Sequence, residues 1–116
     1  MSDKCCKVTD TLGGVNSSTL DTMCTFFKVI ADKTRLRILM ALLGGNLCVM
    51  HISEAVGMSQ SATSHQLAIL RRADLVRVTR KGKMLVYAIS DEHVRLLLDM
   101  AILHLNHGTP MKEEES

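Results

Sequence analysis

The stretch LCVMHISEAVGMSQSATSHQLAILRRADLV, residues 47–76, constrains the fold more than any other part of the chain. A short helix is expected near residues 49–56, because Gly57 can end a helix in the left-handed conformation. Ser59 is a favourable N-cap for a second helix that runs to about Arg72. Two helices joined by a short turn that contains glycine are typical of a helix-turn-helix.

The next segment changes its period from that of a helix to that of a strand. LVRVTRKGKMLVYAI, residues 75–89, alternates apolar and polar side chains around the basic tetrapeptide RKGK, which predicts a β-hairpin with a basic tip. A helix-turn-helix pattern alone also fits an ordinary helical hairpin, but a basic hairpin directly after it favours DNA binding. The predicted fold class is mainly α with a small β-hairpin wing, a winged helix-turn-helix.

Helical segments flank this unit on both sides. An apolar helical period begins at Ser18, residues 32–43 form a helix that ends at Gly44-Gly45, and residues 91–107 are helical again. The inward positions expected on the first two of these helices are Cys24, Leu36, Leu39, Met40 and Leu43.

The 116 residues are enough for one small domain. We predict a flexible N-terminal arm over residues 1–17, the DNA-binding and dimerisation domain over 18–107, and an acidic C-terminal tail over 108–116. No apolar run approaches the roughly 18 residues of a membrane span, and the polar N-terminus does not resemble a secretory signal. We therefore expect a cytoplasmic protein with no membrane partner, whose four cysteines stay reduced.

The first turns of the second helix in the pair are the predicted base-reading surface, because a recognition helix reads base edges from its N-terminal end. Their polar side chains are Gln60, Ser61, Thr63, Ser64 and His65. A solvated, well-capped helix start is the alternative interpretation. Net charge is only +2, yet six basic residues lie within residues 71–83. We expect phosphate contacts from the wing residues Arg77, Arg80, Lys81 and Lys83.

The last helical segment contains the pattern Asp91-x-His93-x10-His104-x2-His107. His93 and His104 return to nearly the same helix face, but they stand roughly 16 Å apart along the axis, so one helix cannot bring them to one ion. Two copies packed antiparallel can, with Leu97 and Met100 forming an apolar seam between them. We therefore expect a homodimer with two equal sites.

Each site would take Asp91 and His93 from one subunit, and His104 and His107 from the other. Three imidazoles and one carboxylate suit a four-coordinate zinc ion. The alternative is that these histidines are ordinary residues of the surface or of the edge of the core. A zinc enzyme is disfavoured, because four protein ligands would leave no open coordination position.

A second cluster of metal-ligand side chains is weaker. Cys48 and His51 are three residues apart, and Cys5 and Cys6 lie on the predicted arm, which could fold back to them. Such a set would form a softer metal site, but two cysteines in a flexible arm are also consistent with no role.

The stretches DKTRLRILMALL, LCVMHISEAVGMSQSATSHQLAILRRADLV and RKGKMLVYAISDEH, with the final helix, resemble the ArsR/SmtB family of bacterial metal-responsive repressors over roughly residues 19–107. The resemblance implies a homodimer that binds double-stranded operator DNA without metal and releases it when metal binds. It also implies zinc sensing by Asp91, His93, His104 and His107, and DNA recognition by Gln60, Ser61, Ser64 and His65.

Two departures from family patterns bear on the metal. Soft-metal sensors of the family carry Cys-x-Cys where this chain has Cys48-Val49-Met50. Nickel and cobalt sensors of the family tend to add further ligands for six-coordination, whereas no histidine follows His107 here and the tail offers only carboxylates. Zn(II) is therefore the expected effector, with Co(II) or Ni(II) as alternatives. A thiol redox or soft-metal sensor, acting through Cys5, Cys6 and Cys48, is the second hypothesis.

Overall fold

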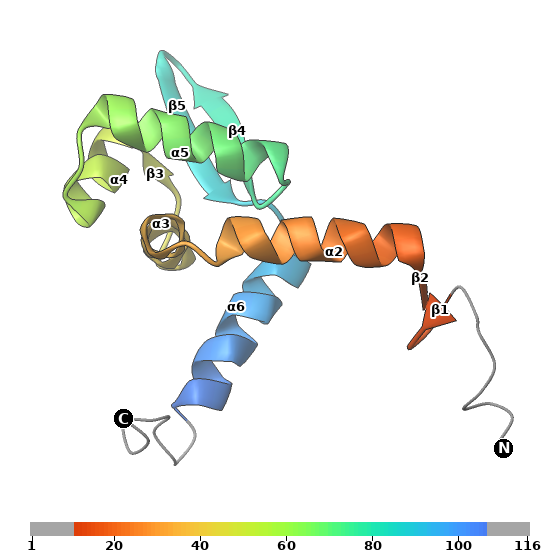
Figure 1. Ribbon diagram of the computed structural model, residues 1–116. Helices are drawn as coiled ribbons and strands as arrows, with labels where there is room; N and C mark the ends of the chain where they lie inside the picture. The colour runs from red at the N-terminus through yellow and green to blue at the C-terminus, as the bar shows by residue number, and fades with distance from the viewer. Residues whose placement is uncertain (1–10, 107–116) are drawn as a thin grey trace, which may run out of the picture.

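The structure is a computed structural model, and it describes residues 11–106. In chain order its elements are β1 (Thr11–Leu12), β2 (Val15–Asn16), α2 (Ser17–Ile30), α3 (Lys33–Leu43), β3 (Leu47–Cys48), α4 (Val49–Val56), α5 (Gln60–Arg72), β4 (Val76–Lys81), β5 (Met84–Ile89) and α6 (Glu92–Leu105). The predicted fold class is confirmed, since helices dominate and the β4–β5 hairpin follows the α4–α5 helix-turn-helix directly (Figure 1).

Each of the longer helices begins where a side chain accepts a hydrogen bond from its otherwise unpaired first turn. These acceptors are Asn16 for Thr19 N at 2.8 Å, Asp32 for Arg35 N at 3.0 Å, Ser59 for Ala62 N at 3.0 Å and Asp91 for Val94 N at 3.0 Å. The short helix α4 ends at Gly57, whose φ of 72° is left-handed. The direction of α5 is thus set by a glycine turn followed by a serine cap, as the sequence predicts.

Two short strand pairings lie beyond the sequence prediction. β3 adds a third strand to the wing, so the antiparallel sheet has the order β3-β5-β4, with Leu47 and Val78 on either side of Tyr87. β1 pairs with β2 inside residues 11–16, a part of the predicted flexible arm. Strands of two residues are too short to show an alternating pattern.

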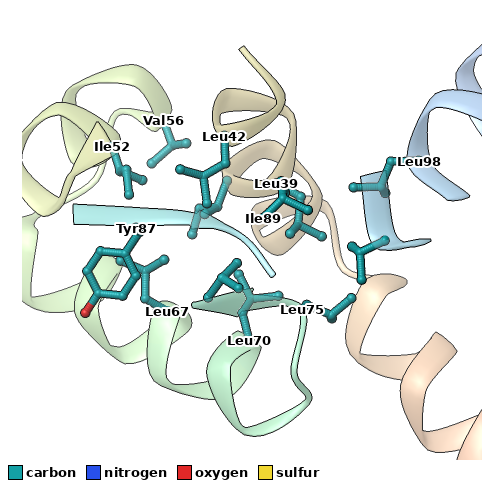
Figure 2. Packing of buried hydrophobic residues seen from close by; sticks show 13 residues of the cluster. Leu39, Leu42, Ile52, Val56, Leu67, Leu70, Leu75, Tyr87, Ile89 and Leu98 are labelled. Atoms are coloured by element: carbon teal, nitrogen blue, oxygen red, sulfur yellow. The ribbon is translucent and has the colours of Figure 1, made fainter. Parts of the chain in front are cut away.

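The core lies where α3, α4 and α5 meet the sheet (Figure 2). Its fully buried aliphatic side chains are Ile38, Leu39, Leu42, Ile52, Leu67, Leu70 and Leu75. The inward position predicted at Met40 is wrong, because that side chain is 37% exposed while its neighbours at 38, 39 and 42 are buried. Met40 instead lines an apolar groove bordered by α2, α3 and α6.

Helices α2 and α6 extend away from this core (Figure 1). Their exposed apolar side chains include Leu20, Met23 and Phe27 of α2, and Leu96, Met100, Leu103 and Leu105 of α6. Cys24 is also exposed rather than buried, because α2 has no buried residue in this single chain. Across residues 11–106, no helix combines the length and the apolar character needed to cross a membrane.

Candidate nucleic-acid interface and metal-ligand clusters

The N-terminal half of α5 presents a short polar surface. Gln60, Ser61, Ser64 and His65 are all exposed there. Ser59 holds this end of the helix, because its hydroxyl oxygen accepts from Ala62 N at 3.0 Å. The surface is therefore built on a capped helix start rather than on a loop, the arrangement by which a recognition helix reads bases.

Thr63 does not belong to this surface, which corrects the sequence prediction. Its side chain is fully buried, and its hydroxyl donates to the backbone carbonyl of Ser59 at 2.8 Å. Thr63 shares the inward stripe of α5 with Leu67 and Leu70, at the spacing i, i+4 and i+7. This spacing could have predicted from the sequence that Thr63 is buried. The sequence prediction instead assigns Thr63 to the polar surface because its side chain is polar.

The tip of the wing carries three exposed cations. Gly82, with φ 65°, turns the hairpin between β4 and β5, and Arg80, Lys81 and Lys83 surround it. Nothing in the tip buries these side chains, so they remain available to a phosphate backbone.

Arg77 lies at the opposite end of the hairpin, where it faces Ala88 across the strands. Its Nη1 atom donates to the carbonyls of Ile89 and Ser90, both at 2.8 Å. The hydroxyl of Ser90 donates in turn to the carbonyl of Asp74 at 2.8 Å. Arg77 therefore anchors the base of the wing, and a phosphate would have to share its guanidinium with these carbonyls.

The predicted metal ligands lie at the two ends of α6. Asp91 caps the helix, and its Oδ1 atom is 3.7 Å from Nδ1 of His93, whose side chain is 93% exposed. His104 lies in the last turn and is also exposed. Within residues 11–106, no three potential ligands gather closely enough to hold one ion. The fourth predicted ligand, His107, falls outside that range.

Cys48 and His51 form a close pair at the start of α4. The Sγ atom of Cys48 is 3.4 Å from Nδ1 of His51, and Cys48 is half-buried. The other two residues of this predicted site, Cys5 and Cys6, lie outside the described residues. The structure therefore brings together one thiol and one imidazole of the four groups.

A capped helix-turn-helix, an exposed polar start of α5 and a basic wing together define a winged-helix DNA-binding protein. The family model described as "Bacterial regulatory protein, arsR family" matches residues 32–78. The HTH-type transcriptional regulator NmtR of Mycobacterium tuberculosis is 48% identical over 80 residues, which cover 69% of this chain and 67% of that protein. This chain belongs to the ArsR/SmtB family of transcriptional regulators, and it is not an enzyme.

Two further relatives extend this comparison. A transcriptional repressor SmtB homolog of Synechocystis sp. is 42% identical over 86 residues, covering 74% of this chain and 65% of the relative. A cadmium resistance transcriptional regulatory protein CadC homolog of Staphylococcus aureus is 35% identical over 79 residues, covering 67% of this chain and 65% of the relative. The match to these two relatives thus stops just short of two thirds of their length.

Solved structures agree with the fold. The solution structure of apo-NmtR has a TM-score of 0.73 at 36% identity and covers 91% of this chain and 90% of that one. A homodimeric winged helix-turn-helix DNA-binding domain from Mycobacterium bovis has a TM-score of 0.70 at 30% identity, covering 87% of this chain and 100% of that one.

Proposed function

We propose that this protein is a zinc-responsive repressor that binds double-stranded operator DNA as a homodimer and releases it when Zn(II) binds at the dimer interface. The protein would act in the cytoplasm, and release of the operator would derepress genes for metal efflux or metal resistance. One observation carries the proposal: ligand side chains occupy both ends of a protruding helix whose middle is apolar and exposed.

The apolar surface supports a dimer through α2 and α6. Large side chains such as Phe27, Leu96, Met100 and Leu103 are between 46% and 59% exposed, and a soluble monomer rarely leaves so many together. A two-fold contact buries the same surface on both copies. If the two α6 helices run antiparallel, the first turn of each one meets the last turn of the other.

The donor set at each end suits zinc in this arrangement. Asp91 and His93 would act together from one subunit, and the separation of 3.7 Å between Asp91 Oδ1 and His93 Nδ1 supports this pairing. His104 and His107 of the partner subunit would complete four-coordination with two imidazoles that are three residues apart in the sequence. Closed four-coordination fits an effector site rather than a catalytic one. Co(II) would be a surrogate for Zn(II), while Ni(II) would require further ligands.

The DNA-binding half of the proposal rests on α5 and the wing. Gln60, Ser61, Ser64 and His65 would face base edges in the major groove, and Arg80, Lys81 and Lys83 would contact phosphates. These surfaces do not overlap with the ends of α6. Zinc and operator can therefore oppose each other only by favouring different conformations of the dimer.

A second function has one specific observation in its favour. The 3.4 Å contact between Cys48 and His51 pairs a thiol with an imidazole, the start of a soft-metal or thiol redox site. It would become a sensor only if Cys5 or Cys6 joined it.

The test is a zinc titration of the dimer with and without operator DNA. We expect zinc to weaken operator binding about 5- to 150-fold, and operator to weaken zinc binding by the same factor. His104→Ala should fold, bind operator and no longer respond to zinc. The matched control is Cys5→Ser with Cys6→Ser and Cys48→Ser, which should still respond. If the triple variant loses the response while His104→Ala keeps it, the cysteine site is the sensor.

A further inference from the structure

Arg35 joins three helices through one side chain. It lies in the first turn of α3, where its backbone N–H is held by the Asp32 cap. Its Nε atom donates to the carbonyl of Val29 in the last turn of α2 at 2.7 Å, and its Nη1 atom donates to Oε1 of Gln66 in α5 at 3.2 Å. The guanidinium thus connects the end of α2 with the middle of α5.

The chemistry of the two contacts explains why an arginine is needed. The carbonyl of Val29 is one of the unpaired acceptors at a helix C-terminus, where a positive charge is also favourable. A guanidinium has five donors in a planar fork, so it can satisfy this carbonyl and still reach a second acceptor. A lysine ammonium has no such fork and could not hold both acceptors in a fixed geometry.

Gln66 is placed where it can restrain the sideways tilt of α5. The inward stripe of Thr63, Leu67 and Leu70 sets how deeply the helix lies on the core. At 100° per residue, Gln66 lies roughly 70° to one side of the centre of that stripe. A helix seated along one line of contacts can still swing sideways across the core, which tilts its axis. The bond from Arg35 restrains this motion from the side.

We propose that Arg35 and Gln66 are positioning residues for operator recognition, which set the angle of α5 relative to the dimerisation helix α2 and so select the spacing between DNA half-sites. This inference rests on the proposed function, in which α2 and α6 form the dimer contact. Neither residue has to touch DNA, because the effect passes through the orientation of Gln60, Ser61, Ser64 and His65.

The size of the effect follows from the length of α5. Its 13 residues span about 20 Å. A tilt of about 10° around its C-terminal end would move the N-terminal end by about 3 Å, close to the roughly 3.4 Å rise of one base pair. In a dimer the displacement occurs twice, in opposite directions. Loss of the restraint would therefore weaken the preference of the dimer for one half-site spacing over another.

The test measures spacing preference in the full-length dimer. An operator selected from a random duplex library is lengthened or shortened by one base pair at its centre, and the ratio of affinities for the original and altered duplexes is recorded. Gln66→Met keeps the length of the side chain and removes the acceptor. We expect it to lower this ratio between about 3-fold and 10-fold, the range that corresponds to the net contribution of one typical intramolecular hydrogen bond.

Arg37→Met is the matched control, because it removes an exposed arginine from the same helix. It should lower overall DNA affinity at most and leave the ratio unchanged. Arg35→Met should lower the ratio as Gln66→Met does, and the double variant should lower it no further. Arg35→Met also removes the hydrogen bond to α2 and could prevent folding. In that case the result for Gln66→Met alone tests the inference.

An unchanged ratio in a folded, dimeric Gln66→Met variant would overturn the inference and leave the repressor proposal intact. A wild-type dimer with no preference for any duplex would instead overturn the proposed function itself. A variant that loses free energy of unfolding but keeps the ratio would show a purely structural contact, which also contradicts the inference.

Discussion

Thr63 and Ser64 are neighbours on α5 with opposite environments. Thr63 is fully buried and bonded to Ser59, while Ser64 is exposed on the polar surface of the helix. Residue type alone does not separate them, because both are small hydroxyl side chains at the start of a predicted recognition helix. Only their positions relative to Leu67 and Leu70 do.

Thr63→Ala should lower the free energy of unfolding by about 1–3 kcal/mol, since it removes a buried methyl group and a satisfied hydrogen bond. In the folded protein the ratio of operator to random-DNA affinity should stay the same. Ser64→Ala should behave in the reverse way, with unfolding changed by at most about 0.5 kcal/mol and the ratio lowered about 5-fold or more. Urea unfolding and DNA titration measure the two effects. If Thr63→Ala lowers the ratio of operator to random-DNA affinity and Ser64→Ala leaves it unchanged, the assignment of Ser64 to the DNA-reading surface is wrong.

At the scale of elements, the sequence predicts the helices and the hairpin closely, because each boundary carries a strong local signal. Ser59 and Gly57 mark the helix-turn-helix, and Gly82 marks the wing tip. β3 could not be predicted, since Leu47 and Cys48 become a strand only through pairing with β5. The role of Arg77 was also hidden, because its partners are backbone carbonyls twelve or more residues away.

The wing tip and its base should differ in how they affect DNA binding. Replacing Arg80 and Lys81 together by Ala should lower the slope of log K against log salt concentration by up to about two units, because two phosphate contacts are lost. Lys28→Ala with Lys33→Ala removes the same charge from α2 and α3 and should leave the slope nearly unchanged. DNA affinity measured over a range of salt concentrations distinguishes the two double variants. Equal slopes for all three proteins would exclude the wing tip from the interface.

For the whole molecule, the distribution of apolar side chains is the informative feature. The pattern of α6 predicts a helix with ligands at both ends, and the structure places those ends on a protruding element. The sequence could not predict that α2 leaves its own apolar side, including Cys24, uncovered beside it. The apolar residues that a single chain leaves exposed depend on packing between elements far apart in the sequence. Local periodicity carries no information about this packing.

Met100→Glu should convert a dimer into a monomer, because Met100 is 59% exposed on the apolar side of α6 and a carboxylate there would be buried against its own symmetry mate. Met50→Glu adds the same charge to an exposed position on α4 and should remain dimeric. Sedimentation equilibrium measures the mass of each. The monomer should also lose most of its operator affinity, since it presents one recognition helix instead of two. A dimeric Met100→Glu protein would move the interface elsewhere.

The hydrogen bonds at the base of the wing give the hairpin the mechanics of a cantilever. Arg77 clamps the carbonyls of Ile89 and Ser90, Ser90 N bonds to the carbonyl of Leu75, and Val76 and Ile89 are buried beside them. Beyond Val78 the strands carry mainly exposed side chains out to Gly82. We therefore expect the largest displacement at the free end, which could follow a wider or narrower groove while the base of the wing keeps its contacts. A flexible tip and a rigid base would let the hairpin adapt to the shape of the DNA while the position of α5 stays unchanged.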